Sequence, residues 1–564
     1  MLCSVRTSPG VSPSTHQGAR APQIFRIAAL SALMALAVTG CGGGGSDSAP
    51  AAAAQTAPVV AAPAPTAAAP AVPAASAASP ALAPTPGPAT ASTQAETIQS
   101  SVLTQNMCAA PRAGIDPSTG SAFPDQPGAL VQEKSWVRAW IDETYLWFDE
   151  IPSSIQAAVY STPQAFFGAL RTPAVTASGK PRDRFHFTYP TNVWYDLSRS
   201  GVMSGYGFEL AILKSQPPRD VRVAYTEPGT PAALAGIGRG ARVVSVDGAD
   251  VVASKSVDVV NAALFPAAAG ESHTFGLQEL DGSVRTVVLT SARITTLPVQ
   301  NVKTLETATG RVGYMQFNDH VATSEGQLIA VMSSFKNDGV QDLVLDLRYN
   351  GGGLLDIASE LAFMIANPQA TTGAVFERLQ FNRKNPFQLN DAATVTPFHS
   401  KSVGFSTPQG LPLPQLGLSR VTVLTGPDTC SASESIINGL RGVNVQVTQI
   451  GGTTCGKPYG FIPHDNCGTT YFAIQFKGVN NQGFGDYADG IAPTCVVADD
   501  FSHPLGDPAE GRLAAALSYR ANGTCPPAPV ALAAQAAGSG AVLLSGKSAA
   551  RTGRFLRLGA SGLR

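Results

Sequence analysis

The spacing of apolar residues predicts a helix near the start of the folded part of the chain. In "EKSWVRAWIDETYLWFDEIP" (133–152), Trp136, Trp140 and Trp147 recur at intervals of four and seven residues. These intervals place the three side chains on one face of a helix. Such a stripe is typical of core packing, and the stretch contains no evident chemical site. We therefore expect residues 98–200 to form a helical N-terminal region.

The pattern changes after residue 200, where short β-branched runs alternate with turns rich in Gly, Pro and Asp. These runs occur in "SGYGFELAIL" (204–213) and in "VRVAYTEPGTPAALAGIGRGARVVSVDGADV" (221–251), where "TPAALAG" adds a short helix. Strand-like runs bounded by turn residues predict a small β-domain.

This β-domain, over 201–296, resembles a PDZ domain. "GYGF" matches the carboxylate-binding loop of that family, and "PGTPAALAGIGRGARVVSVDG" matches its helix-to-strand segment. In such a loop consecutive backbone N–H groups hold a terminal carboxylate, while the peptide adds a strand to the sheet edge. The resemblance therefore implies a substrate-binding loop made of Gly205, Tyr206, Gly207 and Phe208.

The third part, over 300–525, alternates strands with helices. Strands are expected at 311–317, 342–347 and 421–425, and helices at 324–335 and 354–366. Such alternation predicts an α/β layer structure whose loops carry the functional site. The fold class expected for the whole chain is multidomain α/β.

Composition sets limits on partners and compartment. A net charge of −1 provides no attraction to nucleic acid, and 44% hydrophobic residues suffice for several cores. Arg20 and Arg26 precede an apolar run at 27–38, which is too short to span a bilayer and is typical of a signal peptide. "VTGC" then resembles a bacterial lipobox, which would make Cys41 a lipidation site. An ordinary signal peptide with an incidental cysteine is the alternative.

Two further segments are expected to lack a core. Residues 42–97 are rich in Ala and Pro and carry no charge between Asp47 and Glu96, so they predict a disordered tether. Residues 526–564 are rich in Ala, Gly and Ser and predict a disordered tail. The expected location is the periplasmic side of a bacterial envelope, anchored by lipid to the outer membrane.

The remaining cysteines suggest disulfides. An even number of cysteines in an exported chain favours up to three bridges, with fifteen possible pairings. Cys108 and Cys525 bracket the folded region and suggest one pair, while Cys430 and Cys455 are expected to bond to each other or to Cys467 and Cys495. Since no Cys/His spacing suggests zinc, no metal site or other cofactor is expected.

Candidate chemistry begins at "DTCSASESII" (428–437), where a strand gives way to a helix. Ser431 stands at that helix N-terminus, a position that an ordinary N-cap also explains. However, "DLRYNGGG" (346–353) ends another strand in a glycine-rich turn, and Lys457 lies in "GGTTCGKPYG" (451–460). Because no histidine occupies a comparable motif, the pattern predicts a Ser–Lys dyad.

Residues 130–520 resemble the tail-specific, or C-terminal processing, peptidases. These combine a helical N-terminal region, a PDZ domain and a crotonase-like (ClpP-like) α/β protease core. Three segments carry the resemblance: "SASE" (431–434), "TCGK" (454–457) and "DLRYNGGG" (346–353). The family's C-terminal stretch is similar to "YFAIQ", "YADGIAPTCVVADD" and "LGDPAEGRLAAAL".

The resemblance assigns roles to individual residues. Ser431 would be the nucleophile and Lys457 the base, with Glu434 positioning the pair. The amides of Ala432 and of Gly352 or Gly353 would hold the oxyanion. Polypeptides with free C-termini would be the substrates.

Two departures from the family pattern stand out. The family often continues G-K-G-x-x-Q, whereas "GKPYGF" lacks both the glycine and the glutamine. The Ser431–Lys457 separation is also about one residue longer than expected. A catalytically silent lipoprotein that presents a PDZ groove is therefore an alternative, while a crotonase-like enzyme acting on acyl-CoA conflicts with export.

Overall fold

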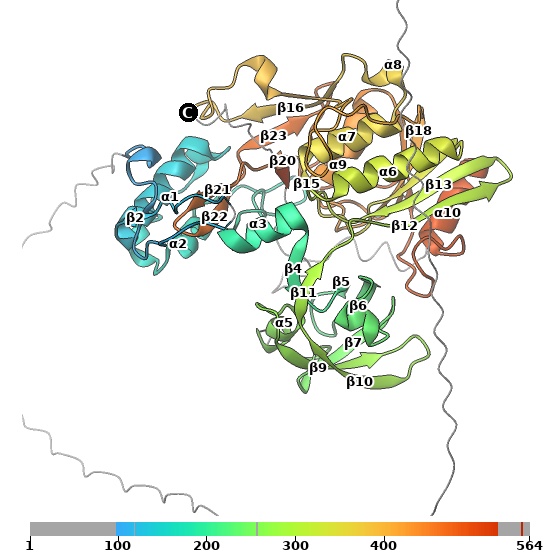
Figure 1. Ribbon diagram of the computed structural model, residues 1–564, viewed down its shortest axis with the longest axis horizontal. Helices are drawn as coiled ribbons and strands as arrows, with labels where there is room; N and C mark the ends of the chain where they lie inside the picture. The colour runs from blue at the N-terminus through green and yellow to red at the C-terminus, as the bar shows by residue number, and fades with distance from the viewer. Residues whose placement is uncertain (1–97, 118, 255–257, 528–553, 556–564) are drawn as a thin grey trace, which may run out of the picture. The chain divides into compact units, whose positions relative to one another are not determined.

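The computed structural model describes residues 98–117, 119–254 and 258–527, together with the backbone of 554–555 (Figure 1). The predicted signal segment at 1–41, including Cys41, and the predicted linker at 42–97 lie outside the described residues. No helix in the described part of the chain is long and apolar enough to cross a membrane.

The N-terminal region is built on the predicted tryptophan face. Trp136 and Trp140 are buried, and their rings stack with centroids 5.4 Å apart. However, the helix ends at Thr144, and the backbone is extended at the next residue. Trp147 therefore lies beyond the helix, a correction to the single predicted stripe. The elements are η1 (Ser101–Leu103), β1 (Met107–Cys108), β2 (Gln126–Pro127), α1 (Leu130–Thr144), η2 (Phe148–Glu150), η3 (Ala157–Val159), α2 (Pro163–Ala169), β3 (Phe187–Pro190) and α3 (Thr191–Ser200).

A compact β-domain follows. Its main sheet has the order β10-β9-β7-β6-β5, which leaves β5 at an edge, and β4 pairs with β11. Its elements are β4 (Val202–Gly205), β5 (Phe208–Lys214), β6 (Asp220–Thr226), α4 (Pro231–Leu234), β7 (Arg242–Val246), β8 (Ala249–Asp250), α5 (Asp258–Leu264), β9 (Ser272–Gln278), β10 (Val284–Thr290) and β11 (Ala292–Thr295).

The third part is organised by one sheet of order β12-β13-β14-β18-β19-β24, parallel from β13 onward. Parallel neighbours place their carboxyl ends at one edge, where loops gather functional groups. The elements of this sheet are β12 (Val299–Thr307), β13 (Gly310–Phe317), β14 (Asp342–Asp346), β18 (Arg420–Thr425), β19 (Gln446–Gly451) and β24 (Cys495–Val496).

Helices cover both faces of this sheet. One apolar cluster joins it to the helices α6 (Ser324–Asn337), α7 (Leu355–Ile365) and α9 (Ala432–Gly442). A second cluster joins the opposite face to α10 (Gly511–Asn522). Buried strands between two helical layers explain why their sequences read as continuous apolar runs.

Smaller elements complete the core. They are β15 (Gly353–Leu354), α8 (Pro368–Thr371), β16 (Val375–Phe381), η4 (Asp391–Thr394), β17 (Val395–Pro397), β20 (Tyr459–Gly460), β21 (His464–Asn466), β22 (Thr469–Phe472), β23 (Phe476–Val479) and β25 (Arg554–Phe555). β3 of the N-terminal region pairs with β22, so the two regions share a sheet. β25 lies within the segment expected to be unstructured, and it pairs with β15.

Candidate active site

Ser431 occupies a tight turn between a strand and a helix. β18 ends at Thr425, and α9 begins at Ala432 directly after Ser431. Ser431 has φ 60° and ψ −114°, a backbone conformation that residues with a Cβ rarely adopt. An ordinary N-cap residue has an extended backbone, whereas a serine on a sharp strand-to-helix turn is typical of nucleophile elbows. The geometry therefore favours the nucleophile over the simple cap.

The glycine-rich turn after β14 lies directly against Ser431. A Cβ added at Gly352 would stand 2.9 Å from the Ser431 Cβ and 2.9 Å from the Ala432 nitrogen. The φ of Gly352 is also +103°, so both space and backbone conformation require glycine. The Cys430 amide and the Ser433 hydroxyl each donate to the Asn350 carbonyl at 3.0 Å, which fixes the turn beside the serine.

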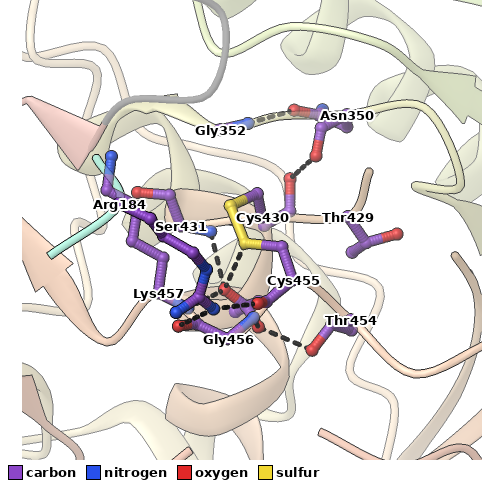
Figure 2. The surroundings of a disulfide bond; sticks show 12 residues. Arg184, Asn350, Gly352, Thr429, Cys430, Ser431, Thr454, Cys455, Gly456 and Lys457 are labelled. Atoms are coloured by element: carbon purple, nitrogen blue, oxygen red, sulfur yellow. Dashed lines mark hydrogen bonds between the residues drawn. A yellow bond between two sulfur atoms is a disulfide. The ribbon is translucent and has the colours of Figure 1, made fainter. Parts of the chain in front are cut away.

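The predicted oxyanion amides differ in their present engagement. Ala432 is the first residue of α9, so its N–H has no acceptor within the helix. The Gly352 N–H instead donates to Asn350 Oδ1 at 2.9 Å (Figure 2). In this conformation Gly352 is therefore directed at its own turn, and it could serve an oxyanion only after that bond breaks.

His320 supports the same turn and was missed at the level of sequence. Its amide donates to the Gly352 carbonyl at 3.1 Å, and its carbonyl accepts from the Leu354 amide at 2.8 Å. Its Nδ1 lies 3.0 Å from Asn350 Oδ1, and burial lowers the pKa of His320 to about 3. A ring that stays neutral in this way acts as a structural support for the turn.

Lys457 lies on the loop between β19 and β20, with its side chain fully buried. Its Nζ is 3.9 Å from the ring centroid of Phe461 and 4.8 Å from that of Phe185. Phe461 stands four residues after the lysine, where the family pattern has its glutamine. An aromatic face thus occupies the position of the absent amide.

Glu434 connects the serine segment to the lysine segment. One carboxylate oxygen accepts from the amides of Ser431 (2.9 Å) and Lys457 (2.8 Å). The other accepts from the Thr454 hydroxyl (2.5 Å) and the Gly456 amide (2.8 Å). Burial raises the pKa of Glu434, although these hydrogen bonds oppose the rise. The carboxylate therefore fixes the two backbones relative to each other.

A disulfide and an arginine reinforce that connection. Cys430 bonds to Cys455 with a Cα–Cα distance of 5.1 Å, which is one of the predicted alternatives (Figure 2). Arg184, from the N-terminal region, donates to the carbonyls of Cys455 (2.7 Å), Gly456 (3.3 Å) and Ala488 (3.2 Å). Arg184 was not predicted, and nothing in its local sequence marks it.

The other two disulfides correct the sequence-based prediction. Cys108 bonds to Cys467, and Cys495 bonds to Cys525, so the expected Cys108–Cys525 pair is wrong. Each end of the folded region is thus tied separately to the third part of the chain.

The only cluster of metal-ligand type found in the described ranges is Cys430, Glu434 and Cys455. Both of its sulfur atoms are joined in the disulfide, whereas metals bind the thiolate form of cysteine. With the bridge intact, this group does not offer a thiolate site.

A buried ionic network joins the glycine-rich turn to the β-domain. Arg348 contacts Asp346, Asp499 and Glu510. Arg239 of the β-domain donates to Asp499 and to the Tyr349 hydroxyl, each at 2.7 Å. Although burial opposes it, nearby arginines hold the pKa of Asp499 well below its usual range. The C-terminal stretch thus supplies the carboxylates that position this turn.

The "GYGF" loop borders a cavity of about 910 Å³, lined by β4, β5, α5 and part of α3. Gly207 has φ +87°, and a Cβ there would lie 2.2 Å from Thr230, so the loop is tightly held. Tyr206 is buried and donates its hydroxyl to the Ala263 carbonyl at 2.9 Å. The tyrosine ring thus supports α5, while the cavity runs beside the free edge of β5.

Residues 311–496 match the peptidase family S41 model, and 132–188 match the model of the peptidase S41 N-terminal domain. A carboxyl-terminal-processing protease of Picosynechococcus is 29% identical over 354 residues, covering 60% of this chain and 74% of that protein. A chloroplastic C-terminal processing peptidase of Tetradesmus obliquus is 29% identical over 180 residues, covering 30% and 38%.

The fold has a counterpart of known structure. The crystal structure of an S41 protease from Bacteroides fragilis matches with a TM-score of 0.52 and 24% identity, covering 69% of this chain and 97% of that one. With its serine turn, its glycine-rich turn and its two family matches, the chain belongs to the S41 family of C-terminal processing peptidases, and it is a serine-type peptidase.

Proposed function

We propose that this peptidase is an endopeptidase with a Ser431–Lys457 dyad, which cleaves exported polypeptides recruited through their C-termini. The observation that carries the proposal is the Glu434 carboxylate, which accepts from the amides of both residues at 2.9 and 2.8 Å. A buried carboxylate bound to four donors holds its partners in one arrangement. Glu434 is thus the positioning residue of the pair.

Lys457 acts as the base. An amine can accept the serine proton only when it is neutral, and full burial disfavours the charged ammonium. After transfer, the positive charge on Nζ lies 3.9 Å from the Phe461 ring, whose face attracts cations. Burial therefore favours the neutral amine, whereas the Phe461 ring stabilises the charged ammonium, so the two effects oppose each other at Nζ.

Ser431 then attacks the peptide carbonyl and forms an acyl-enzyme. The Ala432 amide and an amide from Gly352 or Gly353 stabilise the oxyanion. Since the Gly352 N–H donates to Asn350 in this conformation, we infer that the turn adjusts when substrate binds, or that Gly353 supplies the second donor. The Lys457 ammonium returns the proton to the leaving amine.

Substrate recruitment is assigned to the cavity beside β5. The cavity lining includes Gly205, Tyr206, Gly207 and Phe208, and β5 has one unpaired edge in its sheet. An extended C-terminus can add to that edge while its carboxylate meets the loop amides. The apolar lining from Leu264 and Phe265 favours a small or apolar last residue.

The enzyme is proposed to act on the periplasmic side of a bacterial envelope, anchored by lipid at Cys41. Three disulfides are consistent with an oxidising compartment. Cys41→Ala should release the protein from the membrane fraction, and unchanged fractionation would refute the anchor.

Digestion of casein by wild type, Ser431→Ala and Lys457→Ala tests the dyad. Both variants should lose activity to a similar low level, because nucleophile and base act as one unit. Circular dichroism and binding of a C-terminal peptide check that each variant is folded. If folded Lys457→Ala digests casein normally, the dyad assignment is wrong.

A further inference from the structure

A second segment of the chain contacts the strands that adjoin the proposed dyad. β25, Arg554–Phe555, pairs in parallel with β15, with Arg554 opposite Gly353 and Phe555 opposite Leu354. β25 also contacts β20, Tyr459–Gly460. β15 directly follows the glycine-rich turn, and β20 follows Lys457 by one residue. An extended piece of this chain therefore contacts both strands that leave the proposed site.

β25 takes the one edge of β15 that the core leaves open. On the other edge His320 is bonded to the Gly352 carbonyl and the Leu354 amide, and it forms a parallel bridge with Gly353. A strand has two hydrogen-bonding edges, so an added strand can approach only from the opposite side. Addition of an extended peptide to an open edge is a general mode of peptide recognition.

From this placement we propose that the segment around Arg554 is a substrate of the chain's own active site and is cleaved intramolecularly. The proposal rests on the Ser431–Lys457 function proposed above. Ser431 lies beside Gly352, one residue before the residue that pairs with Arg554. At about 3.3 Å per residue of strand, the bond presented to Ser431 lies within about two residues of Arg554.

The length of the intervening chain permits such a reaction. Cys525 is fixed to Cys495 by a disulfide, so the tether between anchor and strand spans residues 525–554. An extended chain of this length can reach about 95 Å, well beyond the width of a domain. Tethering makes the local concentration of the segment roughly millimolar, which favours cleavage within one molecule over cleavage between two.

The reaction balances as an ordinary acyl transfer. Ser431 Oγ bonds to the carbonyl carbon while its proton moves to Lys457 Nζ. The C–N bond breaks, the lysine proton passes to the released amine, and the remaining chain is held as an ester. Water then hydrolyses the ester, giving a new carboxylate and restoring the serine hydroxyl.

Intact-mass measurement of the purified full-length chain over time tests the proposal, with casein digestion followed in parallel. Wild type should lose the piece that follows a cut within two residues of Arg554, at a rate independent of protein concentration. Ser431→Ala should keep its full mass. Phe555→Pro should be processed at least 10-fold more slowly, because proline removes the N–H that strand pairing needs. Ala536→Pro, a matched change outside β25, should be processed like wild type.

The outcomes separate the two proposals. An enzyme that digests casein yet keeps residues 554–564 intact overturns self-processing and leaves the dyad standing. Cleavage of Phe555→Pro at the wild-type rate, or a rate proportional to protein concentration, also overturns it. If wild type cleaves neither casein nor its own segment, the proposed function itself fails.

Discussion

Replacing Glu434 with glutamine tests whether one buried carboxylate holds the dyad together. In the folded chain each carboxylate oxygen accepts two hydrogen bonds, from Ser431 and Lys457 on one side and from Thr454 and Gly456 on the other. A glutamine has one acceptor oxygen, so its NH₂ group must face two donors whichever way the amide is turned.

The magnitude follows from those two lost bonds. Hydrogen bonds to charged groups contribute about 1.5–3 kcal/mol each, so the gross loss is about 3–6 kcal/mol. Part of this is offset because a neutral amide is less unfavourable to bury than a carboxylate. If about 2.7 kcal/mol appears as displacement of Ser431 from Lys457, kcat falls about 100-fold.

Steady-state cleavage of a fluorogenic peptide measures this loss. We expect kcat of Glu434→Gln to fall about 100-fold, with peptide binding to the β5 cavity unchanged, since that cavity is built from other residues. Thr454→Ser is the matched control, because it keeps the hydroxyl donor and should stay within a few-fold of wild type. A folded Glu434→Gln variant with kcat within threefold of wild type would refute the positioning role.

Lys457→Arg should abolish casein cleavage, since a guanidinium stays protonated, and normal cleavage by this folded variant would contradict the base assignment. Phe461→Gln restores the residue type of the family and removes the ring whose centroid lies 3.9 Å from Lys457 Nζ. This change should shift the acidic limb of the pH–kcat/KM profile. An unchanged profile would show that the ring does not influence the ionisation of the base. Reduction of Cys430–Cys455 should lower kcat under conditions in which the protein is still folded, because the disulfide joins the serine and lysine segments. If activity and folded structure are instead lost together, the bridge only stabilises the fold. Burial raises the pKa of Glu360 to about 8. The contribution of this group to stability is therefore fully present below about pH 4.5 and is lost as the pH rises to 8. Calorimetry should show that Glu360→Gln raises Tm above that of wild type more at pH 8 than at pH 5.

The segments proposed to form the site could be placed in order from the sequence because each is local. Ser431 directly follows a strand and a short loop, and Lys457 follows the next strand in the same way. Parallel neighbours in a sheet bring such strand ends together, so periodicity and turn residues already indicated one site. The "GYGF" loop was readable for the same reason, since a glycine-rich turn and the strand after it are consecutive.

The partners that hold these segments were not readable. Arg184 donates to the Cys455 carbonyl across 271 residues, and Arg239 reaches Tyr349 across 110. His320 belongs to no sequence motif, yet it supports the turn through its own backbone and ring. None of these side chains has a periodic or local signature, because each one acts through a contact made only after the domains pack.

Backbone propensity, periodicity and short motifs depend on neighbouring residues, so the sequence by itself indicated most of the elements and the candidate groups Ser431 and Lys457, whose catalytic roles stay predictions. Tertiary structure decided the disulfide pairing, the four bonds to Glu434 and the engagement of the Gly352 amide with Asn350. It also decided that Arg554–Phe555 forms a strand on β15, within a segment whose composition predicted none. The physical reason is that a two-residue strand has little stability of its own and forms only where an unpaired edge supplies its hydrogen-bonding partners.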